Sequence, residues 1–209
     1  MSQLVACCFG EGLVVAADRR VAVDLRGERQ IHAIRKLFPL GGTAVVATSG
    51  AAVGIAVSRN LHRFLRRRAS PPFEDLEAYA LSVFQKEYAE FIRQGEEWFR
   101  SHPDAHRLSY ILLGGRQHDS KWALRFYASE AHHEPYRLLP TVQVVTAPRR
   151  LGLEARLGLA IRQGASAESL CDLALEGLRV ISQKEEGVGA PFDWVAFGRE
   201  GTRSGTEET

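Results

Sequence analysis

Apolar positions in the first fifty residues fall into short runs that are separated by turn residues. The four runs flank the glycine turns Gly10-Glu11-Gly12 and Gly41-Gly42, and they cover residues 4–9, 13–17, 35–40 and 43–48. Short apolar runs bounded by glycine are typical of β-strands. Because the runs barely alternate with polar residues, we expect strands that are covered on both faces. The segment therefore predicts two β-hairpins.

The apolar spacing then changes to the period of a helix. Val53, Val57, Leu61 and Leu65 share one face and predict a helix over residues 51–68, followed by a longer helix over 73–101. Beyond it, apolar runs predict strands and helical spacing predicts helices. The strands are expected at 108–113, 122–128, 136–139, 142–146 and 192–197, and the helices at 150–162 and 167–184.

This order of strands, two helices, strands, two helices and a strand is not a βαβα alternation. It favours an α+β fold, namely a four-layer αββα sandwich of two antiparallel sheets with a helix pair on each outer side. We expect a single domain over residues 1–198. The polar segment 199–209 is expected to be a disordered tail.

The composition narrows the function classes. The 209 residues carry 27 Lys and Arg against 25 Asp and Glu, and this balance argues against a nucleic-acid partner. No apolar run approaches 18 residues, so no membrane span is expected. The three cysteines form neither a disulfide framework nor a CxxC pair, which is typical of small core residues in a cytoplasmic protein. No motif indicates a metal or a cofactor.

Candidate chemistry begins at Ser2. If Met1 is removed, Ser2 carries a hydroxyl and a free α-amine on the same residue. The amine has an ordinary pKa of roughly 7.7–8.0, so it can accept the hydroxyl proton near neutral pH. Nucleophile and base then belong to one residue. Because many chains begin with Met-Ser, this interpretation needs support from elsewhere in the sequence.

That support comes from three further segments. The second strand ends in Val14-Val15-Ala16-Ala17-Asp18-Arg19-Arg20, a lysine precedes apolar residues in Lys36-Leu37-Phe38, and small residues lead into a helix at Thr48-Ser49-Gly50-Ala51-Ala52. Together with Ser2, these segments resemble the β-type proteasome subunits and their bacterial relative HslV. The element order matches over nearly the whole chain, whereas the motifs are specific over about residues 2–65.

The resemblance implies the N-terminal-nucleophile hydrolase fold and a role for each matched residue. Ser2 would be both nucleophile and base, Lys36 the buried cation beside it, and Asp18 the partner that orients Lys36. Arg20 would support the turn behind Asp18, and the Gly50 N–H would stabilise the oxyanion. The family's late acid aligns with Glu185, and the alternative is Glu186.

The resemblance also implies how a peptide would bind. Val21, Ala22 and Ala52 would pair with an extended substrate backbone. The side chain before the cleaved bond would contact uncharged residues, so cleavage after hydrophobic residues is expected. These pocket residues are Val21, Ile34, Phe38, Thr48 and Ala52.

Three departures from the family pattern stand out. Ser replaces the catalytic Thr, Thr146-Ala147-Pro148 replaces a Gly-Ser-Gly turn, and a carboxylate longer than the family's stands at Glu185. The chain is also longer than HslV, mainly in the helix that ends near Pro103. This combination resembles the branch known as the betaproteobacterial proteasome homologue.

The first functional hypothesis is an endopeptidase built as a homo-oligomer of stacked rings, with unfolded protein or peptide as substrate and no cofactor. Two alternatives remain. One is a non-catalytic structural subunit of the same fold, which retention of Met1 would favour. The other is a non-proteolytic N-terminal-nucleophile amidohydrolase, which a closed small-ligand pocket would favour.

Overall fold

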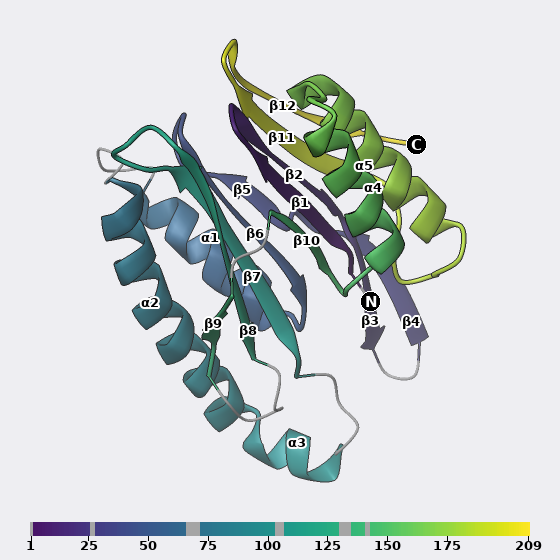
Figure 1. The fold of residues 1–209 in the computed structure, drawn as a ribbon. Helices are drawn as coiled ribbons and strands as arrows, with labels where there is room; N and C mark the ends of the chain where they lie inside the picture. Colours follow the sequence, from purple (N-terminus) through teal and green to yellow (C-terminus); the bar gives the residue numbers. More distant parts are fainter. Residues whose placement is uncertain (1, 26–27, 66–71, 103–106, 130–134, 141–142) are drawn as a thin grey trace.

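The computed structural model describes residues 2–25, 28–65, 72–102, 107–129, 135–140 and 143–209. The predicted ends of the helix at 66–68 and of one strand at 142, and Pro103, lie outside these ranges. Within them, two five-stranded antiparallel sheets lie face to face, with helices on both outer sides (Figure 1). The expected four-layer α+β sandwich is confirmed.

The first sheet contains the strands nearest the N-terminus. Its order is β10-β1-β2-β11-β12. The strands are β1 (Leu4–Phe9), β2 (Gly12–Asp18), β10 (Val144–Ala147), β11 (Phe192–Gly198) and β12 (Gly201–Glu207). All seven residues of β2 are buried, as expected for a strand covered on both faces. The register pairs Leu4 with Ala17, so β1 begins where β2 ends.

The second sheet is a meander of antiparallel neighbours in the order β5-β6-β7-β8-β9. Its strands are β5 (Leu37–Pro39), β6 (Ala44–Gly50), β7 (Ser109–Arg116), β8 (Trp122–Ser129) and β9 (Arg137–Leu139). The chain leaves β6 at Gly50 and enters the first helix almost at once.

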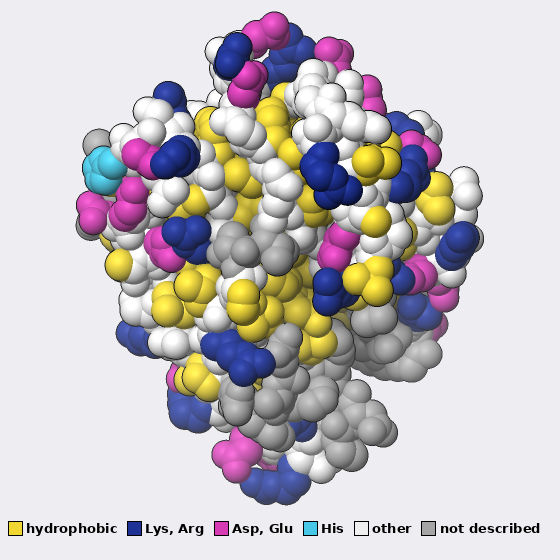
Figure 2. All heavy atoms as spheres, viewed as in Figure 1, with side chains coloured by type: hydrophobic (Ala, Val, Ile, Leu, Met, Phe, Trp, Pro, Cys, Tyr) yellow, Lys and Arg dark blue, Asp and Glu magenta, His cyan; other side chains and the backbone are white. Residues whose placement is uncertain are grey.

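Helices cover both outer faces. The second sheet is covered by α1 (Val53–Leu65) and α2 (Phe73–Gln94), and the first sheet by α4 (Leu151–Arg162) and α5 (Ala167–Ser182) (Figure 1). Three apolar cores result, one under each helix pair and one between the sheets. Apolar side chains gather in the middle of one face, along the line where the sheets meet (Figure 2).

The predicted long helix is broken. Gly95 separates α2 from α3 (Glu96–Ser101). Glycine is a poor helix former, and a Cβ atom at Gly95 would lie 2.6 Å from the Phe99 ring. The apolar spacing continues on both sides of Gly95, and for this reason it predicted one continuous helix.

Two strand pairs were not predicted. β3 (Arg20–Leu25) and β4 (Glu28–Ala33) pair as a separate ribbon, in which every residue of β4 is exposed. The expectation of a disordered tail was wrong, since β12 pairs with β11 from Phe192↔Glu207 to Gly198↔Gly201. Backbone pairing orders β12, and its sequence carries no apolar pattern that would reveal it.

Two further expectations can be compared with the structure. Cys7 and Cys171 are buried, Cys8 is partly buried, and all three thiols are free. Within the described ranges, no helix is both long and apolar enough to cross a lipid bilayer.

Candidate active site

A buried ion pair lies where β2 ends. Lys36 Nζ donates to both carboxylate oxygens of Asp18 at 3.0 Å and to the backbone oxygen of Arg20 at 2.6 Å. Lys36 is 1% exposed and Asp18 is fully buried. All three ammonium hydrogens therefore have acceptors, which is how a charged lysine is accommodated in a protein interior.

Burial and mutual attraction act in opposite directions on this pair. Desolvation raises the pKa of Asp18, whereas Lys36 and the Gln3 and Gly189 backbone groups stabilise its carboxylate and act to lower it. Desolvation likewise lowers the pKa of Lys36, and Asp18 acts to raise it. Each charge is tolerated in the interior because the other is present.

The peptide group between Ser2 and Gln3 is fixed at both of its polar atoms. The Gln3 N–H donates to Asp18 Oδ1 at 2.8 Å, and the Ser2 carbonyl oxygen accepts from Ser49 Oγ at 2.9 Å. Asp18 Oδ1 therefore bonds both to Lys36 Nζ and to the peptide nitrogen that follows Ser2. Ser2 itself is 9% exposed. These bonds hold the Ser2 backbone at the end of β6, beside the ion pair.

Gly50 is the last residue of β6, next to Ser49. Its φ is +91°, and a Cβ atom here would lie 2.4 Å from the Leu108 carbonyl oxygen. Only glycine adopts this conformation without strain. Ser49, the neighbour of Gly50, bonds to the Ser2 carbonyl oxygen, and the resemblance expects the Gly50 N–H as the oxyanion donor.

Arg20, at the start of β3, contacts the segment that follows α5. Its guanidinium packs against Gly189, where a Cβ atom would lie 2.2 Å from Arg20 Cζ, and Nη1 donates to the Glu186 carbonyl oxygen at 3.1 Å. The Glu186 carboxylate pairs with Arg29 in the β3–β4 ribbon at 3.2 Å. The segment after α5 is therefore anchored to the start of β3.

The two candidate acids point to different partners. Glu186 pairs with Arg29, whereas Glu185 pairs with the Arg150 guanidinium. Arg150 Nε also donates to Gln3 Oε1 at 2.9 Å. Arg150 therefore connects Glu185 to Gln3, the residue that follows Ser2. The described contact of Glu185 is with Arg150 rather than with Ser2.

The residues expected to bind substrate differ in accessibility. Ala22 and Ala52 are exposed, and Val21 and Ile34 are partly exposed. By contrast, Phe38 packs in the core beneath α1 with its ring 5.6 Å from that of His62, and Thr48 Oγ1 donates to the Tyr110 carbonyl oxygen at 2.9 Å. In this conformation Phe38 and Thr48 belong to the core.

Thr146-Ala147-Pro148 stands where the family has a Gly-Ser-Gly turn, and its contacts are with α4 and Gln3. Thr146 Oγ1 donates to Glu154 at 2.8 Å and accepts from the Arg150 backbone N–H at 2.6 Å, so its hydroxyl stabilises the start of α4. The Pro148 carbonyl oxygen accepts from Gln3 Nε2 at 2.9 Å. This turn therefore holds Gln3 through a backbone group.

Sequence reasoning missed Gln3, Ser49 and Arg150. Gln3 is a polar residue at the edge of an apolar run and is fully buried. Arg150 offered a clearer signal, because a cation at a helix N-terminus opposes the helix dipole and calls for a specific partner. Ser49 lies in the small-residue segment that was singled out, but the interpretation of that segment centred on Gly50.

Two cavities of the described residues lie away from the candidate site. A cavity of about 750 Å³ lies between α5 and the β11–β12 hairpin, and one of about 440 Å³ lies beside Phe73 and Arg116. Neither contains Ser2, Asp18, Lys36 or Gly50. Among the described residues, no three His, Cys, Asp or Glu side chains cluster as metal ligands would.

Two antiparallel sheets stacked between helix layers, with β1 as an inner strand of the first sheet, give this chain the four-layer αββα fold that its sequence predicted. The fold matches a solved structure, the Gly-1 mutant of Anbu from Hyphomicrobium sp. strain MC1, with a TM-score of 0.69. The match covers 100% of this chain and 88% of that chain at 17% sequence identity, so the likeness concerns the fold. No protein-family model and no curated protein matches the sequence.

Proposed function

We propose that this chain is a proteasome-like endopeptidase whose nucleophile is Ser2, exposed by removal of Met1. The observation that carries the proposal is the fixed peptide group after Ser2, held between Ser49 and an Asp18 carboxylate that is itself paired with buried Lys36. This arrangement fixes the Ser2 backbone through its carbonyl and the next N–H, and it needs neither the α-amine nor the hydroxyl of Ser2.

In the proposed reaction the Ser2 amine accepts the Oγ proton as Oγ attacks the substrate carbonyl carbon. The Gly50 N–H stabilises the resulting oxyanion, and one such donor contributes on the order of 3 kcal/mol. The amine then gives the proton to the leaving nitrogen as the C–N bond breaks. Water, deprotonated by the same amine, hydrolyses the ester to Ser2 and restores the free hydroxyl.

We propose that an extended peptide lies along the exposed backbone near Val21, Ala22 and Ala52, adding a strand between them. Ile34 and the edges of Phe38 and Thr48 would meet the side chain before the cleaved bond, which favours a hydrophobic residue there. Because Phe38 and Thr48 are buried in the free chain, this pocket has to open on binding. Glu185 would act through Arg150, which forms its ion pair.

We also propose that the chain assembles into homo-oligomeric stacked rings, and that it belongs to the branch of the betaproteobacterial proteasome homologues. The fold and the alignment of Ser2 with the family's nucleophile support the stacked rings. The long helical segment that contains α2 and α3 supports the branch. The proposal of a non-catalytic subunit of the same fold differs from ours in one measurable respect, which is the state of Met1.

The test has two parts. The intact mass of the purified protein should correspond to a chain that begins at Ser2. Hydrolysis of fluorogenic peptides with a hydrophobic residue before the cleaved bond should then be abolished in Ser2→Ala, whereas Ser2→Thr should retain it or raise it. The exposed Ser82→Ala serves as the matched control.

Full peptide turnover by Ser2→Ala would exclude Ser2 as the nucleophile. Retention of Met1 would favour the structural subunit, because an extended terminus has no α-amine next to the hydroxyl. Hydrolysis of small amides without cleavage of peptides would favour the amidohydrolase.

A further inference from the structure

The Gln3 side chain is bonded at every polar atom. Nε2 donates to the carbonyl oxygens of Leu4 at 3.1 Å and Pro148 at 2.9 Å, and Oε1 accepts from Arg150 Nε at 2.9 Å. Gln3 is fully buried, so these bonds replace its contacts with water. Asp18 fixes the Gln3 main chain and Arg150 fixes its side chain, which leaves the residue after Ser2 a single orientation.

Arg150 connects this side chain to an acid. Its guanidinium donates to Gln3 with Nε and pairs with Glu185 through Nη2, and the two charged side chains are each 29% exposed. A planar fork of donors can serve both partners at once, which a lysine ammonium does with less geometric definition. Because Arg150 stands at the start of α4, it opposes the helix dipole, and its contacts offset that cost.

We propose that Arg150 is a positioning residue of the candidate site, with two effects. It holds Gln3, and hence the Ser2 backbone, in place. It also keeps the Glu185 carboxylate paired, so that this carboxylate does not stabilise the protonated form of the Ser2 amine. The inference rests on the proposed function, since it concerns the amine that acts there as the base.

The charged side chains on the segments that hold Gln3, Asp18 and Arg20 are largely paired with one another. Asp18 at the end of β2 pairs with Lys36 before β5, and Arg150 at the start of α4 pairs with Glu185 after α5. Arg29 in the β3–β4 ribbon pairs with Glu186, whose carbonyl oxygen also accepts from Arg20. Removal of the Arg150 cation leaves Glu185 unpaired, and Arg150 had joined this carboxylate to Gln3, the residue next to the amine. A nearby negative charge favours the ammonium form, so the amine pKa should rise.

The first experiment measures the amine directly. The rate at which acetic anhydride acetylates the Ser2 α-amine is followed against pH by mass spectrometry, because only the neutral amine reacts. Arg150→Met should raise the amine pKa by about half a unit or more. The double variant Arg150→Met with Glu185→Gln should return the pKa to the wild-type value, since the carboxylate is gone.

The second experiment measures peptide hydrolysis in the same variants. The acid limb of the pH–rate profile should move upward in Arg150→Met together with the amine pKa, and kcat should fall at least about threefold while KM changes less. The double variant should recover the pH profile but not kcat, because Gln3 still lacks its donor. Arg150→Lys should lie between the wild type and Arg150→Met.

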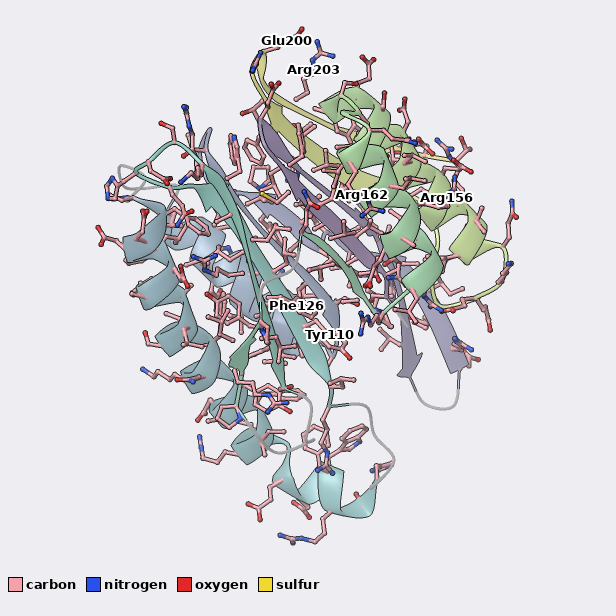
Figure 3. The ribbon with its side chains drawn as sticks, viewed as in Figure 1. Tyr110, Phe126, Arg156, Arg162, Glu200 and Arg203 are labelled. Atoms are coloured by element: carbon pink, nitrogen blue, oxygen red, sulfur yellow. The ribbon has the colours of Figure 1, made fainter. Side chains whose placement is uncertain are left out.

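Arg156→Met is the matched control. Arg156 lies on α4, in the outer helix layer (Figure 3), and its exposed side chain pairs with Glu176 at 3.1 Å. It should change neither the amine pKa nor kcat.

An unchanged amine pKa in Arg150→Met would overturn the inference, including when the variant loses thermal stability, since that result indicates a purely structural pair. Acetylation requires no turnover, so the two proposals can fail separately. A shifted amine pKa in a protein that cleaves no peptide would support the role of Arg150 and contradict the peptidase.

Discussion

At the scale of single residues, the candidate site depends on a lysine that cannot reach water. Lys36 has three acceptors, two of them on Asp18, and burial acts against the charge on each partner. Removing one partner of a buried ion pair typically costs about 3–5 kcal/mol, because the other charge is left unpaired. Loss of stability and loss of activity must therefore be separated in any test of Lys36.

A double variant achieves this separation. Lys36→Met should lower both the free energy of unfolding and the peptide turnover, the latter by more than about tenfold, since the positive charge beside Ser2 is lost. Lys36→Met with Asp18→Asn leaves no unpaired charge, so it should recover much of the stability but none of the turnover. Urea unfolding and peptide kinetics measure the two quantities.

The exposed Lys86→Met provides the control and should behave as the wild type. Normal turnover in the Lys36→Met variant would reduce Lys36 to a structural role and would favour the non-catalytic subunit.

Gly50 allows a second test at this scale. In Gly50→Ala the methyl group meets the Leu108 oxygen in a left-handed backbone conformation, so the turn must move. We expect a stability loss of about 1–2 kcal/mol and at least a tenfold lower kcat, because the N–H proposed to bind the oxyanion is displaced. Thermal unfolding and kcat are the measurements.

Gly164 provides a control for the effect of backbone strain alone. Its φ is +78°, and a Cβ atom at this position would have no neighbour within 4 Å. Gly164→Ala should therefore lose stability through backbone strain alone, with normal kcat. If Gly50→Ala also keeps a normal kcat, the oxyanion role does not belong to Gly50.

At the scale of elements, periodicity predicted the strands and helices that bury apolar side chains. It failed where pairing does not depend on such burial: β4 is exposed throughout, and β12 reads GTRSGTE. The candidate site shows the same division. Asp18 and Lys36 stand out as charges in apolar surroundings, whereas the contact between Gln3 and Arg150 joins positions 147 residues apart. No local sequence pattern predicts such a contact.

The attachment of β12 gives a prediction about pH. Arg179 donates to both Glu207 oxygens at 2.6 and 2.8 Å, and these bonds lower the pKa of Glu207. The unfolded chain then binds this proton more readily than the folded chain does. The contribution to stability is therefore present above the ordinary pKa of about 4.3 and is lost as the pH falls through the folded value.

Glu207→Gln should accordingly destabilise the protein at pH 7, by less than about 1 kcal/mol because the arginine is well exposed. The difference from the wild type should shrink at pH 3, as measured by urea unfolding at both pH values. Glu208→Gln, at the exposed neighbouring position, is the control. A difference that persists unchanged at pH 3 would show that β12 is not held by the Glu207 charge.

At the scale of the whole molecule, the candidate site lies at one end of the stacked sheets, where β1 begins beside the β3–β4 ribbon (Figure 1). The outer helix layers leave large apolar side chains exposed. Tyr79 on α2 is 42% exposed and Trp98 on α3 is 54% exposed, and Leu159 on α4 is 49% exposed on the opposite layer. Single exposed apolar side chains are common on protein surfaces, and these three mark positions at which a contact between copies can be tested.

In the proposed stacked rings, one of these helix layers forms the contacts between copies. If the α1–α2 layer forms the ring contacts, Tyr79→Glu should shift the protein toward smaller species, because burying an unpaired carboxylate in an apolar contact is costly. Light scattering at micromolar concentration measures the effect. Leu159→Glu makes the same kind of change on the α4–α5 layer and should leave the assembly intact. A stable 23.2 kDa monomer in the wild type would contradict the rings, and equal dissociation by both variants would contradict the choice of layer.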